Sequence, residues 1–577
     1  MDFSCAADGT KCMPPPSSPS SSSSSSLLPT AVLILCVAPL AYVVLPLLWR
    51  AAGLLFGWRL RQRTQLRRRQ ILDLTSSDEK KQPGSRRSSL SSSGKEDSED
   101  GGWEKLDASR SGIANNGAPA GSDPDWDGIV GFFHPFCNAG GGGERVLWAA
   151  IRATQERYPR ATCVVYTGDH GVSKAAMLSR VASRFNIHLH PPSVHFLYLS
   201  TRHWVLASTW PRFTLAGQSL GSVVMAWDAF SLLVPDVFVD TMGYAFALGL
   251  AKWLFGPGLP TAAYVHYPTI STDMLDSLDP ASRVGDQGLN AGQGVGLRGR
   301  LKRRYWRLFA AAYSRVGASA DVVMTNSSWT QQHIQQLWGP PRQARGSARP
   351  IAVVYPPVAV SELEREVDVS AESEARREKM LLYIAQFRPE KNHQLVLQAF
   401  AELVKSASSA AARGARLVLV GSVRDDADSK RVYKLRLLAN ELHIRDQVEF
   451  RLDAPWKDVL DLLRRASVGV NAMWNEHFGI GVVEYQAAGL VAVVHESGGP
   501  KMDIVVDVDG EPTGFHATTA SEFAAAFEKA LALPDPLAVR LRARKSAKRF
   551  TEEEFARRWL EQMEGLFQAR PGQRSSE

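Results

Sequence analysis

Two stretches of the sequence alternate short apolar runs with helix-forming segments, and this alternation constrains the fold more than any other feature. The first stretch has apolar runs at 128–133, 163–167, 261–265 and 322–325. The second has runs at 351–355, 380–385, 416–421, 448–450 and 467–470. Such alternation is typical of parallel sheets covered by helices on both faces. The sequence therefore predicts an α/β chain with two Rossmann-like, doubly wound domains.

The length and composition of the chain agree with two large domains and short appendages. A chain of 577 residues is too long for one ordinary core. With 45% hydrophobic and 22% charged residues the composition is globular, so any disorder is local. We expect the first domain at 126–345, the second at 346–540, and a C-terminal helix and tail at 541–577. The five cysteines have no metal-ligand spacing, so we expect reduced thiols and no metal site.

The N-terminal region predicts a membrane anchor. Residues 1–26 are rich in Ser and Pro and should be disordered, whereas 27–49 contain no charged residue and are long enough to cross a bilayer. We therefore expect a transmembrane helix within 27–57; a cleaved signal peptide is the alternative. Arginines follow the apolar run, which places the rest of the chain in the cytosol. Residues 58–125 should form a basic juxtamembrane segment and, from Ser76, a flexible linker.

The net charge of +8 does not indicate a nucleic-acid-binding protein. The basic residues are scattered, apart from the cluster after the apolar run, and no basic stripe with interleaved aromatic residues appears. A membrane surface is the better explanation. The weakly charged stretch 213–259 has two readings: a buried strand and helix piece of the first domain, which we favour, or a surface that dips into the bilayer. A polar, glycine-rich insertion at 280–300 is expected to be a loop.

The strongest local motif is residues 475–489, in which a glycine-rich loop precedes a helix. Backbone N–H groups at such a helix start favour a phosphate, so Phe478, Gly479 and Gly481 are candidate donor-binding residues. Glu476 could bond sugar hydroxyls and Glu484 a ribose. On a full helix these carboxylates would lie about 12 Å apart, too far for a pair of hydrolytic carboxylates. The alternative is that both are ordinary solvated glutamates.

Two cations and two further glycines extend the predicted site. Arg388 and Lys391 follow a strand and open a helix, where fixed positive charges could neutralise a departing diphosphate. A solvated basic helix start is the alternative. Gly142 and Gly143 allow close approach of a ligand; a flexible turn without a ligand is the alternative for the glycine run 140–143. The run does not spell G-x-G-x-x-G, which disfavours a nicotinamide or flavin site.

Two histidines and a sequon complete the set of candidates. His266 ends a strand before a proline-marked turn and could contact the transferred sugar or the acceptor; a structural role is the alternative. His134 is a weaker candidate of the same kind. The loop that begins at Ser497 could close the donor pocket, or be a plain turn. The sequon at Asn326 is expected to stay unglycosylated, because the predicted topology places it in the cytosol.

Together these motifs resemble the retaining glycosyltransferases of family four, which have the GT-B fold. The runs 133–148, 239–244, 264–274 and 475–481 are similar to those of the dolichol-pathway α-1,2-mannosyltransferases, and the resemblance covers roughly 128–570. It implies a first, acceptor-binding domain and a second, nucleotide-sugar domain. It also implies GDP-mannose as donor, a dolichyl-pyrophosphate-linked trimannosyl-chitobiose as acceptor, and addition of the fourth and fifth mannoses at the cytosolic face of the endoplasmic reticulum.

The resemblance also implies roles for the candidate residues. Arg388 and Lys391 would hold the donor diphosphate, Glu476 the mannose, Glu484 the ribose, and His266 the sugar or acceptor. It implies no cofactor and no metal, and other mannosyltransferases of the pathway are potential partners. One departure is that Ala385-Gln386-Phe387 lacks the glycine that usually precedes the arginine. A related transferase with another lipid acceptor and a non-catalytic scaffold are the alternatives.

Overall fold

The fold is described from a computed structural model, in which residues 27–81, 125–282, 285, 292–347, 349–406 and 412–567 are described, with side chains from residue 44 onward. The predicted disordered N-terminus, 1–26, and residues 82–124 of the predicted linker lie outside this part of the chain. The described chain divides into two units, one ending at Phe56 and one beginning at Gly57.

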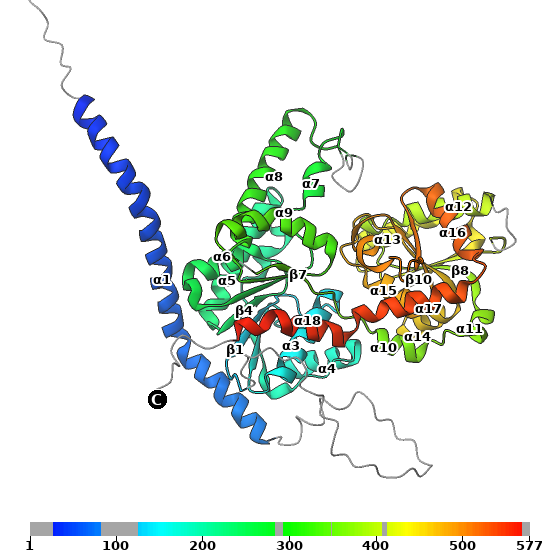
Figure 1. The fold of residues 1–577 in the computed structure, drawn as a ribbon, viewed down its shortest axis with the longest axis horizontal. Coiled ribbons are helices and arrows are strands. Elements are labelled where there is room, and N and C mark those ends of the chain that lie inside the picture. Colours follow the sequence, from blue (N-terminus) through cyan, green and yellow to red (C-terminus); the bar gives the residue numbers. More distant parts are fainter. Residues whose placement is uncertain are drawn as a thin grey trace, which may run out of the picture. The chain divides into compact units, whose positions relative to one another are not determined.

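The first sheet has seven parallel strands in the order β3-β2-β1-β4-β5-β6-β7 (Figure 1). Its strands are β1 Ile129–Phe133, β2 Thr162–Thr167, β3 Val194–Tyr198, β4 Val237–Asp240, β5 Thr261–Val265, β6 Val322–Thr325 and β7 Ile351–Val353. Its helices are α3 Gly142–Arg157, α4 Lys174–Phe185, α5 Thr214–Leu232, α6 Ala245–Phe255, α7 Thr272–Asp276, α8 Gly296–Gly317 and α9 Ser328–Ala344.

The second sheet has six parallel strands in the order β10-β9-β8-β11-β12-β13. Its strands are β8 Glu378–Ile384, β9 Arg416–Gly421, β10 Val448–Leu452, β11 Ala466–Asn471, β12 Val491–His495 and β13 Gly514–Ala517. The helices are α10 Val360–Glu366, α11 Ala371–Arg376, α12 His393–Ser406, α13 Asp426–Glu441, α14 Trp456–Arg465, α15 Ile480–Ala487, α16 Ala520–Leu531 and α17 Pro536–Ala547. Both strand orders reverse beside the first strand of the sheet, and ligands of doubly wound folds bind at such a point.

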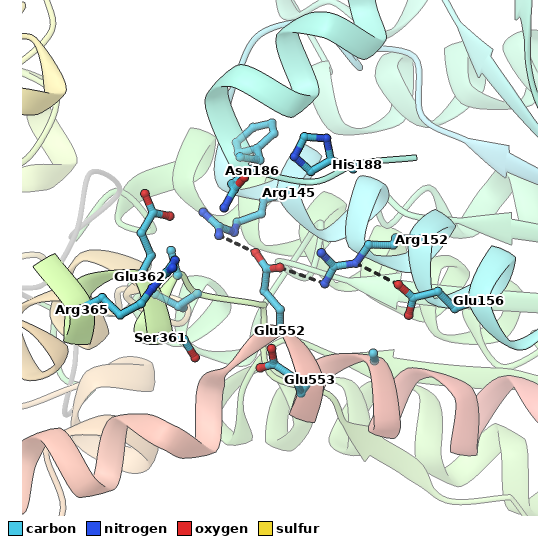
Figure 2. A pocket seen from close by; sticks show the side chains of 14 residues that line it. Arg145, Arg152, Glu156, Asn186, His188, Ser361, Glu362, Arg365, Glu552 and Glu553 are labelled. Atoms are coloured by element: carbon cyan, nitrogen blue, oxygen red, sulfur yellow. Dashed lines mark hydrogen bonds and ion pairs between the residues drawn. The ribbon is translucent and has the colours of Figure 1, made fainter. Parts of the chain in front are cut away.

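The chain crosses between the two domains near 354–360 and returns near 548–551. The backbone N–H of Val358, on the outward crossing, donates to the carbonyl of Phe550, on the return, at 2.9 Å. After the return, α18, Glu552–Met563, packs on the first domain against α3. Glu552 accepts from Arg145 at 2.6 Å and from Arg152 at 2.9 Å (Figure 2).

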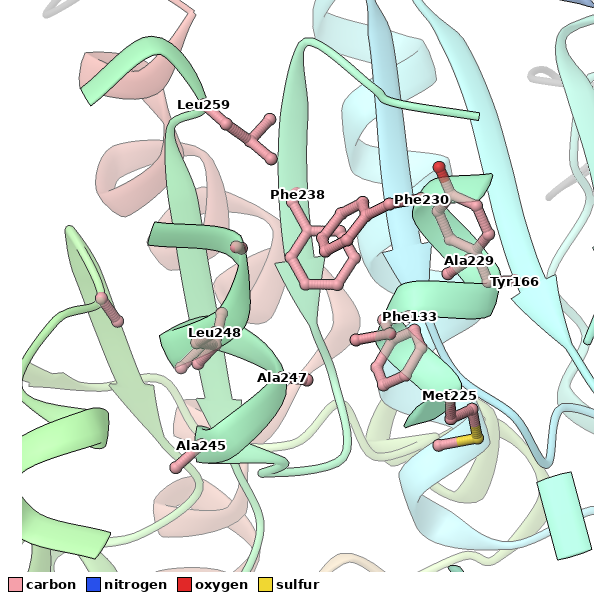
Figure 3. Packing of buried hydrophobic residues seen from close by; sticks show 14 of the residues in the cluster. Phe133, Tyr166, Met225, Ala229, Phe230, Phe238, Ala245, Ala247, Leu248 and Leu259 are labelled. Carbon is pink, nitrogen blue, oxygen red and sulfur yellow. The ribbon is translucent and has the colours of Figure 1, made fainter. Parts of the chain in front are cut away.

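Each face of the first sheet has its own apolar core, as expected when helices cover both faces. On one face, Phe230 of α5 contacts Phe238 of β4 with ring centroids 4.9 Å apart, and Leu248 of α6 joins the same cluster (Figure 3). On the other face, Trp559 and Phe555 of α18 pack among residues of α3 and β1. The apolar face of α18, which carries Phe555, Trp559 and Met563, is therefore buried in the first domain.

The segment 213–259 forms α5, β4 and α6, and β4 is fully buried. The sequence pattern predicted that the strand at 351–353 begins the second domain. It instead pairs with β6 at the edge of the first sheet. A short apolar run does not encode which sheet it joins.

The expectation of a flexible linker that begins at Ser76 is wrong for its first residues, because the helix α1 spans Leu27–Lys81. Helix continues to Lys81, and its second half docks on the first domain. Arg68 pairs with Asp236 at 2.6 Å, and Thr75 Oγ1 lies 2.8 Å from His195 Nε2. These contacts form between residues more than a hundred positions apart, so local composition could not predict them.

The predicted membrane anchor, 27–57, coincides with the first half of α1. Among the residues whose side chains the structure describes, no helix has the length and apolar character required to cross a bilayer. The side chains of 27–43 lie outside that part.

Candidate active site

A cavity of about 270 Å³ lies between the two domains and collects most of the predicted site residues. The first domain contributes Gly142, Gly143 and His266, and the second contributes Lys391, Glu476, Phe478, Gly479 and Gly481. These residues come from the carboxyl ends of strands or the helix starts that follow them, where ligands of open α/β sheets bind. Arg388 and Glu484 are not among the lining residues.

The central contact of the cavity is an ion pair between Lys391 and Glu476. Lys391 ends the short helix Pro389–Lys391 after β8, and Glu476 lies in the loop after β11. The Lys391 ammonium donates to Glu476 Oε2. Burial opposes ionisation of Glu476, but the charge and hydrogen bond of Lys391, together with smaller contributions from His477 and Asn471, lower the pKa of the carboxyl. The cavity therefore holds a fixed carboxylate beside a fixed cation.

The glycine-rich loop ends in a helix start that is open to the cavity. Gly479 precedes α15 with φ at 107°, a conformation that glycine adopts without strain. No side chain caps this helix start. Its first N–H groups and the positive end of the helix dipole favour an anion, such as a phosphate. Ser497 Oγ accepts from the backbone N–H of Asn475 at 2.7 Å, so the loop at Ser497 holds the glycine-rich loop in place.

Glu484 lies about one turn after the start of α15. Its electrostatic environment differs from that of Glu476. Burial raises its pKa to about 7, and the positive charge of Arg145 opposes this only in part. No described side chain hydrogen-bonds its carboxyl group. Arg145 is engaged with Glu552 in the neighbouring cavity of about 480 Å³, which contains none of the predicted site residues (Figure 2).

Arg388 does not join Lys391 at the cavity. Its guanidinium lies 3.9 Å from Glu390, and its side chain is 40% exposed. The spacing of three residues brings the two cations to the same short helix, but the turn directs them differently. In this structure Lys391 alone of the two lines the cavity.

The first-domain wall is formed by the start of α3 and the end of β5. A Cβ atom on Gly143 would lie 3.5 Å from His266 Nε2, an ordinary van der Waals distance, so the start of α3 lies against the imidazole. His266 Nε2 donates to the carbonyl of Thr241 at 3.1 Å, and burial lowers its pKa to about 4. The imidazole is therefore neutral at pH 7, with Nδ1 as the free acceptor. His134 does not line the cavity; it is buried, with Nδ1 2.8 Å from Thr241 Oγ1.

Two residues of the site were missed or misread from the sequence. Asn326, read only as part of a sequon, lines the cavity. His477 also lines it and stacks on Tyr267 with ring centroids 4.1 Å apart, and on Trp329 at 5.5 Å. The sequence signal for His477 was its place inside the glycine-rich motif, between Glu476 and Phe478.

Comparison with known proteins agrees with this geometry. Residues 127–338 match the family described as ALG11 mannosyltransferase N-terminus, and residues 364–550 match Glycosyl transferases group 1. A Neurospora crassa protein named GDP-Man:Man(3)GlcNAc(2)-PP-Dol alpha-1,2-mannosyltransferase is 69% identical, over 92% of this chain and 96% of its own length. This chain belongs to that mannosyltransferase family. The member from Homo sapiens is 43% identical, over 76% of this chain and 87% of its own length.

The fold of this chain is similar to that of solved structures. The N-terminal domain of a Candida albicans trehalose-6-phosphate phosphatase covers 76% of the chain with 96% of its own length, at a TM-score of 0.55 and 11% identity. At such low identity the likeness concerns the fold alone. The predicted GT-B-like fold and the predicted glycosyltransferase membership are confirmed.

Proposed function

We propose that the chain transfers mannose from GDP-mannose, in α-1,2 linkage, to a dolichyl-pyrophosphate-linked Man(3)GlcNAc(2) acceptor, adding the fourth and fifth mannoses. Relatives that carry this name across most of the chain support the donor and the acceptor. The observation that carries the proposal is the Lys391–Glu476 pair, which faces Gly143 and His266 across one cavity.

The geometry suggests a role for each group. The bond between mannose C1 and the donor phosphate breaks while a bond from C1 to the acceptor oxygen forms. Negative charge grows on the departing diphosphate, where Lys391 and the open start of α15 would stabilise it. Glu476 would bind mannose hydroxyls. The acceptor proton passes to the departing phosphate on the same face of the sugar, so the anomeric configuration is retained.

We further propose that transfer requires no metal and no cofactor. The support is the position of Lys391, whose ammonium supplies the positive charge that a divalent cation would otherwise provide. Arg388 would add a second charge only if its side chain turned into the cavity when the donor binds.

The test is transfer of radiolabelled mannose from GDP-mannose to a short-lipid trimannosyl acceptor. Wild type is expected to add two residues, with or without a chelator. Glu476→Gln is expected to lose about 10²-fold or more in rate. The matched control is Glu441→Gln on the exposed face of α13, which should keep full activity.

Three results of this assay would each contradict a different part of the proposal. Full activity of Glu476→Gln would remove the proposed site. Activity lost on chelation would contradict the metal-independent mechanism. A folded wild type that transfers nothing would favour another lipid acceptor, or the scaffold alternative.

We also propose an anchor in the endoplasmic reticulum membrane, with both domains in the cytosol. The support is the uncharged stretch 27–49 and the arginines that follow it. Protease added to sealed microsomes should digest both domains. Full protection that is lost when detergent opens the microsomes would overturn this topology.

A further inference from the structure

The N-terminal turns of α8 expose an unusual combination of side chains, which we call the α8 tip, residues 295–304. Val295, Leu297 and Leu301 are 67%, 68% and 60% exposed. Figure 1 shows α8 extending past the sheet of the first domain, beside α7. Three large aliphatic side chains on one convex helix end are not covered by any described part of the chain.

The basic residues of the α8 tip divide into an inward and an outward group. Inward, Arg303 pairs with Asp279 at 3.3 Å, and Lys302 donates to Gln293 at 2.7 Å. Outward, Arg298, Arg300 and Arg304 are exposed and form no ion pair with any residue that the structure describes. The α8 tip therefore surrounds its exposed leucines with unpaired positive charge.

The placement of these arginines is unfavourable unless an anion is nearby. The first turns of α8 contain no acidic residue, and Val295 provides no side-chain cap. Cations at a helix N-terminus are repelled by the helix dipole. An anionic surface would reverse that effect, because it would neutralise both the arginines and the helix end.

The apolar surface continues along α8. Leu308, two turns after Leu301 on the same face of the helix, is 65% exposed. Phe213, just before α5, is 69% exposed and lies edge-on to Tyr305 of α8 with ring centroids 5.4 Å apart. A helix with exposed leucines flanked by arginines matches the pattern of helices that lie in the lipid headgroup region.

The α8 tip is also linked to the proposed active site. The chain between β5 and α8 carries His266 in the cavity and Asp273 in α7, and Asp273 accepts from Asn475 of the glycine-rich loop at 2.7 Å. The same segment supplies Asp279, the partner of Arg303. Contact between the α8 tip and lipid would therefore act on the segment that borders the cavity.

We propose that the α8 tip docks on an anionic lipid surface, with Val295, Leu297 and Leu301 inserted among the headgroups and the outward arginines bound to lipid phosphates. Arginine can hold its charge at the phosphates while its aliphatic stem covers apolar surface. A lipid surface fits a convex helix end better than a protein partner does, because a protein would have to offer a complementary groove. This contact is separate from the proposed anchor. It would bring the cavity close to an acceptor carried by the same lipid layer, a consequence that rests on the proposed function.

The test uses the full chain reconstituted in vesicles, with Cys5, Cys12 and Cys36 replaced by Ser. An environment-sensitive fluorophore is attached at Leu301→Cys, and quenching by lipids brominated near the headgroup is measured. The matched control is the same label at Leu437→Cys, an exposed leucine of α13 in the second domain. We expect the label at residue 301 to shift to the blue and to be quenched several-fold more than the label at 437, in vesicles that contain phosphatidylserine.

Charge reversal separates the proposed contact from incidental proximity to the membrane. Replacing Arg298, Arg300 and Arg304 with Glu should reduce lipid contact by at least about fivefold for each arginine. A label at residue 301 that is quenched no more than the label at 437, or whose quenching survives charge reversal, overturns the proposal. Mannose transfer by the same protein in detergent reports the proposed function independently.

Discussion

At the scale of single residues, Glu476 and Glu484 show that one motif can hold two carboxyl groups whose pKa values are shifted in opposite directions. Lys391 donates to Glu476 and lowers its pKa. Burial raises the pKa of Glu484 to about 7, and Arg145, whose charge opposes this, is engaged with Glu552. The first carboxyl is therefore ionised at neutral pH, while the second is poised between its two forms.

Replacing Glu484 tests this difference through pH-dependent stability. A carboxyl whose folded pKa lies above its unfolded value of about 4.3 stabilises the fold at low pH, and this stability is lost as pH rises through the folded pKa. Between pH values of about 5 and 8, the free energy of unfolding of wild type should fall relative to Glu484→Gln by on the order of 1–3 kcal/mol. Urea unfolding of both proteins across this range measures the difference, and parallel curves would contradict the raised pKa.

Sequence reasoning found most of the cavity but not the orientation of its side chains. Glu476, Lys391, His266 and the glycines were found because strand ends and helix starts can be read from the pattern. Arg388 does not line the cavity beside Lys391, because a turn of three residues sets directions that spacing does not encode; its role in donor binding stays a prediction. His477 was missed, because its partners Tyr267 and Trp329 belong to the other domain.

At the scale of elements, the starts of α3 and α15 meet across the cavity. A Cβ atom on Gly142 would lie 2.6 Å from Ile480 Cδ1, whereas one on Gly141 would meet nothing within 4 Å. The residue at 142 is therefore constrained by the approach of two helices from different domains, since any side chain there would displace Ile480. Its neighbour at 141 is not under this constraint.

This difference gives a matched pair of substitutions. Gly142→Ala should raise the KM for GDP-mannose several-fold, because the methyl group displaces Ile480 at the start of α15. Gly141→Ala should leave the KM unchanged. Adding Ile480→Val to Gly142→Ala should restore part of the loss by making room for the methyl group. Equal effects of the two alanines would show that contact with Ile480 does not matter.

The C-terminal helix α18 depends on a charge bridge to α3. The carboxylate of Glu552 binds both Arg145 and Arg152, and all three side chains are at most 20% exposed. Glu552→Gln should lower the free energy of unfolding by about 1–3 kcal/mol, since Arg145 would lose its ion-pair partner and Arg152 would keep only Glu156, at 3.7 Å. Glu553→Gln, at the exposed neighbouring position, is the control. Equal unfolding midpoints for the two variants would rule out the bridge as a stabilising contact.

At the scale of the whole molecule, the cavity exists only while the two domains face each other. Asn475 donates to Asp273 at 2.7 Å, and His477 stacks on Tyr267 beside this bond. Asp273 also lies 3.5 Å from His333 Nε2. These contacts join the glycine-rich loop of the second domain to α7 and α9 of the first.

Loss of the Asp273 contact should shift the domains toward an open arrangement. Asp273→Ala removes a hydrogen bond to a charged group, worth about 1.5–3 kcal/mol, so the open fraction should rise roughly tenfold or more. Energy transfer between dyes at Ser183→Cys and Leu437→Cys measures the interdomain distance. Asp276→Ala, at an exposed position of the same helix, should leave the distance distribution unchanged. A distribution for Asp273→Ala that matches wild type would contradict this role.

The two places where the chain crosses between domains limit how such opening can occur. Val358 on the outward crossing and Phe550 on the return are joined by a backbone hydrogen bond, so both connections pass through nearly one point. Two connections fastened together resist sliding and stretching but still permit rotation. The two domains should therefore rotate about this point, so that Gly142 and Ile480 separate on an arc. A donor would enter by that rotation, and product release would require the domains to rotate apart again.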